Sequence, residues 1–576
     1  MKYLIPTFVQ QEEAAGRRQG AFAAYTLFID LSGFTPLTES LMREGNAGAE
    51  RLSNLLNEIF EPLVSLVYAR AGFIPYFAGD AFTAIFPETE TPRAELLIET
   101  AMLARQLFRE RENRFGQFTI GLKFGLGYGE VEWGIVGNEN RAYYFRGAPI
   151  DTCAHCQTLA HDQDIILADD LLAQLPDGYL RLAPVVDNYY RVEGTYDLPP
   201  IPPAIELPPL SETLAAHYLP DAVITYSQDG EFRPVVSVFI AFAGIHGHEL
   251  LDEFSTLVLD QVQTFSGYFK EIDFGDKGGL MAIFFGAPVA FENNIHRALE
   301  FALSLREALA PLAEQHRFRV RAGLTVGTAY TGIVGGKERC QYACVGSRVN
   351  LAARLMVEAQ WGEILVADEI HKASTFRFLH YGDVEYKGIK GAVPTYQLLG
   401  RHFGDKTDYY GDLVARHDEL AKLADFAQPL YSGKAAGLAY IYGEAGVGKS
   451  RLAFELRRLL PEGDRLSWRN CQADQILRKP FNPFIYWMRN YFRQSPEYPL
   501  DTNRQNFANR LRLLRRQLEQ MPTEVARLTL RELDRTQSIL AALMGLPFDN
   551  SLWDQLDAQG RYRNTIAAIL NLILAE

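Results

Sequence analysis

The stretch FIDLSGFT at residues 28–35 decides the fold, because the stretch FIAFAGI at residues 239–245 repeats it with one change of chemistry. An apolar run that ends at Gly33 is typical of a buried strand followed by a turn into a helix. At the position of Asp30 in the first stretch, the second stretch carries Ala241. A methyl group has replaced a carboxylate, so the two copies are unequal and indicate one composite site.

The repeat extends far beyond this strand. A Gly-Ile-Val-Gly sequence closes the repeated part of each copy, and the matching segments are 71–86 with 266–284, 121–129 with 320–327, and 134–137 with 332–335. Self-similarity at this spacing predicts two similar domains in tandem.

The composition excludes several classes of protein. The chain has 576 residues, of which 48% are hydrophobic, and a length of this order fits about three or four domains. A net charge of −14 argues against nucleic acid or an anionic membrane surface as the main partner. Five cysteines do not make a disulfide framework in so long a chain. Because we find neither a signal peptide nor an apolar run of about 18 residues, we expect a cytoplasmic protein without a membrane span.

Hydrophobic periodicity predicts an α+β architecture with helices on one face of a mainly antiparallel sheet. In chain order the first copy is expected to form a strand over 25–31, a helix over 52–67, a hairpin over 73–86, a helix over 92–110 and a strand over 118–126. Gly79 and Asp80 stand at the tip of this hairpin.

The expected domain organisation follows from the repeat and from a proline-rich segment near residue 200. It comprises an N-terminal extension (1–21), the first copy (22–198), a Pro-rich linker (199–232), the second copy (233–400) and a further module (401–576).

Two carboxylates of the first copy are candidate metal ligands. Asp30 ends an apolar strand and Asp80 stands at the hairpin tip, so pairing of these strands would bring both acids together. Adjacent carboxylates repel each other unless cations lie between them, and two Mg²⁺ would clamp a triphosphate. The alternative is structural: Asp30 caps a helix and Asp80 serves a turn.

The link between strand and helix is a candidate phosphate site. Its backbone N–H groups and the helix N-terminus could hold phosphate oxygens, although such turns are also common without a ligand. The residues concerned are Ser32, Gly33, Phe34 and Thr35.

The second copy carries a different pair of polar residues. Asn350 and Arg354 lie four residues apart and thus on one helix face, where an amide could orient a ribose and a guanidinium could stabilise charge on a phosphate. The first copy has Asp151 and His155 in their place. Each copy therefore lacks what the other retains, and neither would work alone.

These segments together resemble the class III nucleotidyl cyclases with two cyclase homology domains, and especially the soluble adenylyl cyclase type. The resemblance covers about residues 22–400 and rests on the segments 28–35, 77–81 and 349–354. It implies two ferredoxin-like domains that form a pseudo-heterodimer, with ATP bound at their shared interface. It also implies attack of the ribose 3′-hydroxyl on the α-phosphorus, which yields cyclic AMP and pyrophosphate.

The resemblance assigns a role to each candidate residue. It implies that Asp30, Asp80 and the backbone carbonyl of Leu31 bind two Mg²⁺ or Mn²⁺, and that Lys123 binds the triphosphate. It implies further that Asn350 orients the ribose and that Arg354 stabilises the transition state.

The sequence departs from the family at two places. Base selection would rest on Lys270, Lys277, Ala343 and Cys344, where the family usually has a lysine and a threonine or aspartate. Tyr76 and Ala154 stand where the soluble type has the lysine and arginine of its bicarbonate pocket, so control by bicarbonate is not expected. The degenerate second site of the pair remains a candidate site for another small effector.

The last module contains a P-loop sequence, and we expect it to be a truncated α/β NTPase domain of the AAA or signal-transducing type. Residues 438–442 would form its strand, and the loop would bind ATP or ADP with Mg²⁺ through Gly443, Gly446, Gly448, Lys449 and Ser450. No acidic pair follows an apolar run, so hydrolysis by this module is not expected.

Three hypotheses follow. The first is an adenylyl cyclase acting as a monomer with one composite site, ATP as substrate and no nucleic-acid partner. The second is a catalytically degenerate nucleotide-sensing regulatory protein, which the altered base-selecting positions favour. The third is a guanylyl cyclase, for which Cys344 is the only support.

Overall fold

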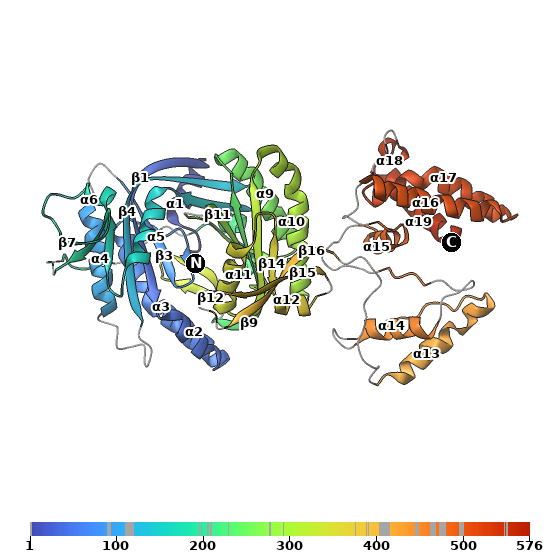
Figure 1. Ribbon diagram of the computed structural model, residues 1–576, viewed down its shortest axis with the longest axis horizontal. Helices are drawn as coiled ribbons and strands as arrows, with labels where there is room; N and C mark the ends of the chain where they lie inside the picture. The colour runs from blue at the N-terminus through green and yellow to red at the C-terminus, as the bar shows by residue number, and fades with distance from the viewer. Residues whose placement is uncertain are drawn as a thin grey trace. The chain divides into compact units, whose positions relative to one another are not determined.

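The computed structural model describes two compact units, Met1–Leu399 and Gly400–Glu576 (Figure 1). None of the helices in the described part of the chain combines the length and apolarity needed to cross a bilayer. The description covers residues 3–576 apart from 89–93, 110–119, 195, 197, 204, 206, 208–209, 228–229, 276–277, 292, 375, 387–388, 390, 402–414, 444–447, 461–467, 472–479, 495–499, 547 and 549–550, and apart from the side chains of Thr35, Glu39 and Asn46.

The first copy has the predicted α+β order, with β1 and β4 longer than the apolar runs suggested and β2 shorter. Its elements are β1 (Gln19–Ser32), α2 (Phe34–Met42), α3 (Asn46–Ala69), β2 (Phe77–Ala78), β3 (Ala81–Pro87), α4 (Ala94–Arg109), β4 (Gly121–Gly137), β5 (Arg141–Arg146), α5 (Ala148–Leu159), β6 (Ile165–Ala168), α6 (Asp169–Leu172), β7 (Arg181–Val186) and β8 (Tyr189–Glu193).

The second copy repeats this order almost element by element. It comprises β9 (Glu231–Ala243), α9 (His248–Thr264), β10 (Tyr268–Gly275), β11 (Gly278–Phe285), α10 (Asn294–His316), β12 (Arg319–Gly335), β13 (Cys340–Val345), α11 (Ser347–Glu358), β14 (Ile364–Ala367), α12 (Asp368–Lys372), β15 (Arg377–Glu385) and β16 (Ala392–Gly400).

The two sheets have the same topology. The first runs β2-β3-β1-β4-β6-β8-β7 with β5 paired to β4, and the second runs β10-β11-β9-β12-β14-β16-β15 with β13 paired to β12. All neighbours for which a register is defined are antiparallel except β4 with β6 and β12 with β14. The tandem repeat read from the sequence is therefore a repeat of the fold.

The copies pack against each other in a reciprocal way. In the N-terminal unit, α3 of the first copy contacts β12 of the second, and α9 of the second contacts β4 of the first. Strand β5 also lies against β10. Such an exchange of equivalent elements is what a pseudo-twofold interface produces.

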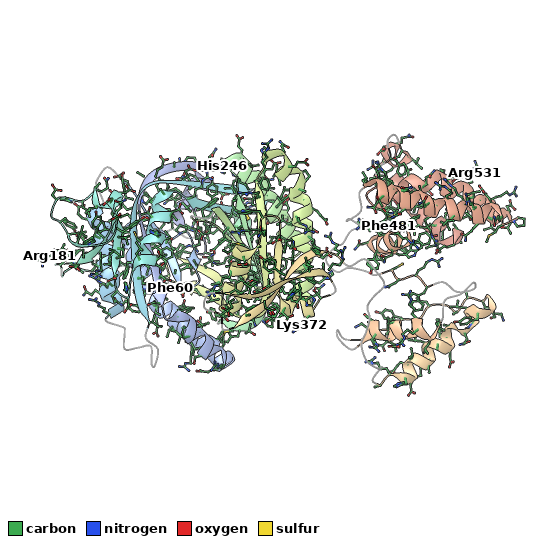
Figure 2. All side chains as sticks on the ribbon, in the orientation of Figure 1. Phe60, Arg181, His246, Lys372, Phe481 and Arg531 are labelled. Carbon is green, nitrogen blue, oxygen red and sulfur yellow. The ribbon has the colours of Figure 1, made fainter. Side chains whose placement is uncertain are left out.

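One hydrophobic core crosses this interface. Phe60 of α3, labelled in Figure 2, is fully buried and belongs to the same cluster as Tyr268 and Tyr330 of the second copy. Burial of aromatic side chains on this scale stabilises an interface strongly, because each removes a large apolar area from water. The copies thus form one body rather than two loosely linked domains.

The N-terminal extension and the linker are also structured in part. Helix α1 (Thr7–Ala14) follows Leu4 and Ile5, which are buried in the shared core. The linker contains the short helices α7 (Glu212–Tyr218) and α8 (Asp221–Ile224), so it is not extended throughout.

All the regular structure described from residue 415 onward is helical. The C-terminal unit contains α13 (His417–Ala427), the 3₁₀ helix η2 (Gln428–Ser432), α14 (Lys449–Leu459), α15 (Asn482–Tyr491), α16 (Leu500–Glu519), α17 (Glu524–Leu543), α18 (Leu552–Gln555) and α19 (Ala558–Ala575). Trp487 and Met488 of α15 are buried in its core, so the aromatic run around Phe481 belongs to a packed helix.

The strand expected before the P-loop is not formed. Residues 438–442 adopt no regular structure, and the side chains of Leu438, Tyr440 and Tyr442 are 93%, 83% and 82% exposed. A P-loop strand needs neighbours that pair with its backbone, and the described residues of this unit supply none. The expected α/β NTPase architecture is therefore not present in the described part of the unit.

Candidate active site

Strand pairing brings the two acids of the first copy together. In the register of β1 and β3, Asp30 lies opposite Ala81, the residue that follows Asp80. The backbone N–H of Leu31 donates to the carbonyl of Asp80 at 3.1 Å, which fixes the hairpin tip beside the end of β1. The acids predicted from the sequence are thus neighbours in space.

The environment of these acids favours a cation between them. The pKa of Asp80 is raised to about 7, first by burial and then by the negative charge of Asp30. Burial also raises the pKa of Asp30, while Lys123 on the paired strand β4 and a hydrogen bond from Gln157 Nε2 at 2.6 Å oppose this rise. A divalent cation would relieve the repulsion between the acids.

The acids do not form a closed metal cage. Within the described ranges, no group of three or more His, Cys, Asp and Glu side chains is placed to hold a metal ion. Two carboxylates with open positions fit Mg²⁺, which commonly keeps waters and substrate phosphates as its remaining ligands. The donor set therefore suits metal that arrives with a nucleotide.

The N-terminus of α2 lies beside this pair. Gly33 adopts a positive φ of 81°, which allows the sharp turn from β1 into α2, and as the N-cap residue it has no side chain that could accept from the first amides of the helix. The N-terminus of α2 is therefore suited to an anion. The backbone of Thr35 belongs to this turn, but its side chain lies outside the described residues.

Helix α11 carries the polar residues of the second copy. Asn350 is exposed, and Arg354 follows one turn later on the same helix. The Nη1 atom of Arg354 is buried and has no hydrogen-bond partner among the described residues. A guanidinium N–H that is desolvated and unpaired is poised to accept an anionic partner.

One cavity of about 170 Å³ joins the two copies. The first copy contributes Phe34 and Asp80, and the second contributes Asn350 together with residues of β10, β11 and β13. Asp30, Lys123 and Arg354 do not line this cavity directly, although Asp30 influences Asp80 at its edge. The structure therefore brings Asp80 and Asn350 to one cleft, with Asp30 immediately behind Asp80.

Lys270 reaches this cavity because β10 is irregular. The pairing of β10 with β11 shifts by one residue between Phe269 and Glu271, and Lys270 is the extra residue. Its Nζ atom donates to the carbonyl of Phe77 at 2.8 Å and to Glu271 at 2.6 Å.

The other residues expected to contact the base differ in whether they line the cavity. Cys344 lines the cavity, and burial raises the pKa of its thiol to about 12, so it stays neutral. Ala343 is buried but does not line the cavity. Lys277 lies outside the described residues.

Two acidic residues of the cavity were missed from the sequence. Glu271 and Asp273 both line it, and the pKa of Asp273 is raised to about 7 by burial and by the charge of Glu271. The Oε2 atom of Glu271 is buried without a hydrogen-bond partner among the described residues. The signal available was the run Lys-Glu-Ile-Asp at 270–273, which places three charges in an otherwise apolar strand.

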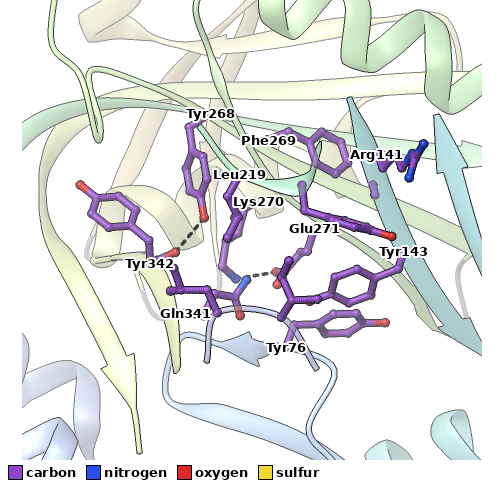
Figure 3. A pocket seen from close by; sticks show the side chains of 14 residues that line it. Tyr76, Arg141, Tyr143, Leu219, Tyr268, Phe269, Lys270, Glu271, Gln341 and Tyr342 are labelled. Atoms are coloured by element: carbon purple, nitrogen blue, oxygen red, sulfur yellow. Dashed lines mark hydrogen bonds and ion pairs between the residues drawn. The ribbon is translucent and has the colours of Figure 1, made fainter. Parts of the chain in front are cut away.

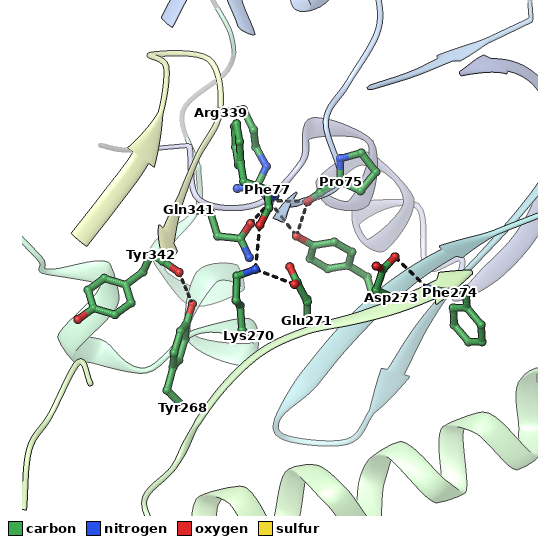
Figure 4. A network of polar contacts seen from close by, with 11 residues as sticks. Pro75, Phe77, Tyr268, Lys270, Glu271, Asp273, Phe274, Arg339, Gln341 and Tyr342 are labelled. Atoms are coloured by element: carbon green, nitrogen blue, oxygen red, sulfur yellow. Dashed lines mark hydrogen bonds and ion pairs between the residues drawn. The ribbon is translucent and has the colours of Figure 1, made fainter. Parts of the chain in front are cut away.

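Residues of the second copy form hydrogen bonds with the segment that precedes Asp80 (Figure 4). Arg339 is fully buried and donates to the carbonyls of Ile74 at 3.0 Å and Pro75, and also to that of Leu4 at 2.8 Å. Gln341 accepts the backbone N–H of Phe77 at 2.8 Å. These bonds fix the backbone a few residues before the hairpin tip.

A second, much smaller cavity lies at the same interface (Figure 3). Its volume is about 30 Å³, and its walls include Tyr76, Tyr143 and Tyr268 as well as Leu4 and Ile5 of the N-terminal extension. A space of this size holds little more than a water molecule. Tyr76, which stands at the position of the bicarbonate-pocket lysine, therefore lines a cavity that side chains nearly fill. Binding of a small effector in the degenerate site stays a prediction.

The P-loop residues belong to the other unit and are only partly described. Gly448 adopts a left-handed conformation as the N-cap residue before α14, while Lys449 Nζ donates to the carbonyl of Gly443 at 3.0 Å. Ser450 follows on α14 and is exposed, and Gly446 lies outside the described residues. Lys449 thus points back onto its own loop.

Comparison with known proteins identifies the second copy. Residues 239–400 match the adenylate and guanylate cyclase catalytic domain family. Adenylate cyclase type 10 of rabbit (Oryctolagus cuniculus) is 24% identical over 501 residues, and that of human is 24% identical over 503 residues. Each alignment covers 76% of this chain but 31% of the relative, so the chain spans about a third of the length of these relatives.

Shorter and structural likenesses are also present. Adenylate cyclase 1 of Rhizobium meliloti (strain 1021) is 33% identical over 124 residues, which is 20% of this chain and 19% of that protein. A solved class III adenylyl cyclase-like ATP-binding protein from Pseudomonas aeruginosa covers 62% of this chain and is itself covered to 86%, with 13% identity and a TM-score of 0.45.

Proposed function

We propose that this chain is a class III nucleotidyl cyclase, and specifically an adenylyl cyclase that converts ATP into 3′,5′-cyclic AMP and pyrophosphate at its composite cavity. The observation that carries the proposal is the cavity itself, which is lined by Asp80 from one copy and Asn350 from the other. Each copy brings the group that its partner has replaced.

The first copy would hold the triphosphate end of the substrate. Asp30 and Asp80 are the residues that would bind two Mg²⁺ or Mn²⁺, with the carbonyl of Leu31 as a further ligand. Bound there, the metals would supply Lewis acidity at the 3′-hydroxyl and at the leaving phosphates. The backbone amides at the start of α2, which follows Gly33, would bind phosphate oxygens, and Lys123 would add positive charge.

The second copy would hold the ribose and the reacting phosphate. The amide of Asn350 would hydrogen-bond the ribose and keep its 3′-hydroxyl in line with the α-phosphorus. The unpaired Nη1 of Arg354 would donate to the α-phosphate oxygens as negative charge develops in the transition state. Arg354 does not line the cavity directly, so this contact requires its side chain to turn toward the substrate.

The part of the cavity that would hold the base suits a purine, and GTP is a second candidate substrate. Lys270 can donate to the N1 atom of adenine or to the O6 atom of guanine, and Glu271 can accept from adenine N6 or guanine N1. Guanine offers a carboxylate two adjacent donors, its N1–H and its N2 amino group, whereas adenine offers only its N6 amino group, so the free Oε2 of Glu271 is the specific observation that favours guanylyl cyclase activity. Similarity to adenylate cyclase type 10 over most of this chain makes ATP the first candidate.

The experiment is a cyclase assay on the purified chain with Mn²⁺ or Mg²⁺ and with either ATP or GTP. We expect cyclic AMP from ATP, and no product from the Asp30→Ala variant. Cyclic GMP as the main product would mean that the substrate is GTP and not ATP, while the proposed site would stand. Nucleotide binding without either product would instead support the nucleotide-sensing protein.

A further inference from the structure

An apolar cavity of about 320 Å³ lies in the second copy, apart from the composite site. Helix α10 covers it with Phe301, Leu305 and Leu309, and strands β9 and β12 form its floor. None of its wall residues lines the composite cavity. Small-molecule sites in proteins have about this volume or more, with apolar walls and a few placed polar groups.

Alternation along β9 separates the two cavities. Val238 and Ile240 face the apolar cavity, whereas Phe239 between them lines the composite one. Successive side chains of a strand point to opposite faces of the sheet. The apolar cavity therefore lies on the other face of the strand that helps to form the composite site.

The polar groups of this cavity are mainly cationic. Its wall includes Arg306, Arg319 and Arg321, against one acidic residue, Glu363. Arg319 and Arg321 lie over the ring of Trp361 at 5.1 and 4.6 Å from its centre. Glu363 is itself engaged, because its Oε2 accepts the backbone N–H of Gln360 at 2.9 Å.

Arg321 has unused hydrogen-bonding capacity. Its Nη1 donates to the carbonyls of Val357 and Ala359 at 2.8 and 2.9 Å, at the end of α11. Its Nε is buried without a partner among the described residues, and burial lowers the pKa of this side chain with no acidic neighbour opposing the shift. An N–H donor left without a partner costs free energy that an anion would recover.

We propose that this cavity binds an amphiphilic carboxylate, with its hydrocarbon part among the side chains of α10 and its carboxylate at Arg321. The apolar walls account for the hydrocarbon, and the excess of arginine accounts for the sign of the charge. The site does not depend on the proposed cyclase activity, since it shares no residue with the composite cavity.

The test is equilibrium dialysis of the full chain against octanoate, with octan-1-ol as the neutral probe of similar length. We expect octanoate to bind with a stoichiometry of one and about tenfold more tightly than the alcohol, the difference that one charge-assisted hydrogen bond provides. Binding of both probes with equal affinity, or of neither, would overturn the proposal.

Two variants locate the site. Leu305→Trp fills the cavity and should abolish octanoate binding. Arg321→Met keeps the apolar stem of the side chain but should weaken octanoate binding about tenfold. Lys372→Met removes an exposed cation that pairs with Asp368 outside the cavity, and it should leave binding unchanged. Octanoate that still binds to the Leu305→Trp variant with unchanged affinity lies elsewhere, which contradicts the assignment.

Discussion

Asp80 and Asn350 line the same cavity although they belong to different copies of the repeat. This relationship makes the two copies complementary, because one provides carboxylates and the other an amide with a nearby guanidinium. It also means that the relative placement of the copies matters as much as the residues themselves. The hydrogen bonds from Arg339 and Gln341 to the segment before Asp80 provide such placement.

Gln157 should tune the metal requirement. Its Nε2 donates to Asp30 at 2.6 Å, so Gln157→Leu removes the bond that orients this carboxylate. Loss of a hydrogen bond to a metal ligand weakens metal binding about tenfold or more. We expect the Mn²⁺ concentration for half-maximal cyclase activity to rise by about this factor. Thr158→Val, one residue later on α5, removes a bond to the carbonyl of His155 instead and should leave the Mn²⁺ requirement unchanged.

Arg339 should hold the hairpin that carries Asp80. Arg339→Met removes one hydrogen bond to the carbonyl of Ile74 and another to that of Pro75, which also accepts from the hydroxyl of Tyr143 at 3.0 Å. We expect a cost of about 2 kcal/mol and local amide exchange about thirtyfold faster. Hydrogen exchange of the peptide 72–87 measures this directly. The neighbouring Lys337 is 86% exposed on the surface, and Lys337→Met should leave the exchange rate as it is. Equal protection in both variants would show that Arg339 does not hold the hairpin.

The pair formed by Lys270 and Glu271 should select the base. Removing Lys270 alone would leave Glu271 buried without its partner, so the informative variant is the double change Lys270→Met with Glu271→Gln. We expect the ratio of kcat/KM for ATP to that for GTP to move toward one. A site that hydrogen-bonds a base edge loses much of its discrimination when those groups are removed. A ratio that stays as in the unmodified protein would assign base selection to other residues.

The P-loop lysine should be dispensable for the cyclase reaction. Lys449 belongs to the C-terminal unit, whereas every residue of the composite cavity belongs to the N-terminal one. Lys449→Ala should therefore leave the rate of cyclic AMP formation within about twofold, since a substitution at an independent site adds no coupling. A fall of tenfold or more would mean that the units communicate during catalysis.

The strands of the sheets could be predicted from the sequence because apolar runs are a local signal. The tandem repeat supported the prediction, since it shows the same pattern twice. The sequence predicted the hairpin with Asp80 at its tip, and the structure has it, although β2 is only two residues long. The strand over 438–442 was wrong, because an apolar run forms a strand only where other strands pair with it.

Residues that act through tertiary contacts were not predictable in this way. The bulge at Lys270 depends on how β10 pairs, and nothing in the residue types reveals the register shift. Arg339 makes its bonds to backbone carbonyls far away in the chain, and carbonyls leave no mark on the sequence. The pairing of Glu271 with Lys270 inside the cavity follows from the same bulge.

The most direct test of the composite site compares Arg354→Ala with His155→Ala in the cyclase assay. These residues occupy equivalent positions of the two copies, on α11 and α5, so the pair controls for a general effect of substitution in these helices. We expect Arg354→Ala to lower kcat about a hundredfold or more, as loss of a transition-state donor does, and His155→Ala to retain the rate of the unmodified protein. An Arg354→Ala variant of full activity, or an equal loss in both variants, would contradict a composite site to which Arg354 contributes.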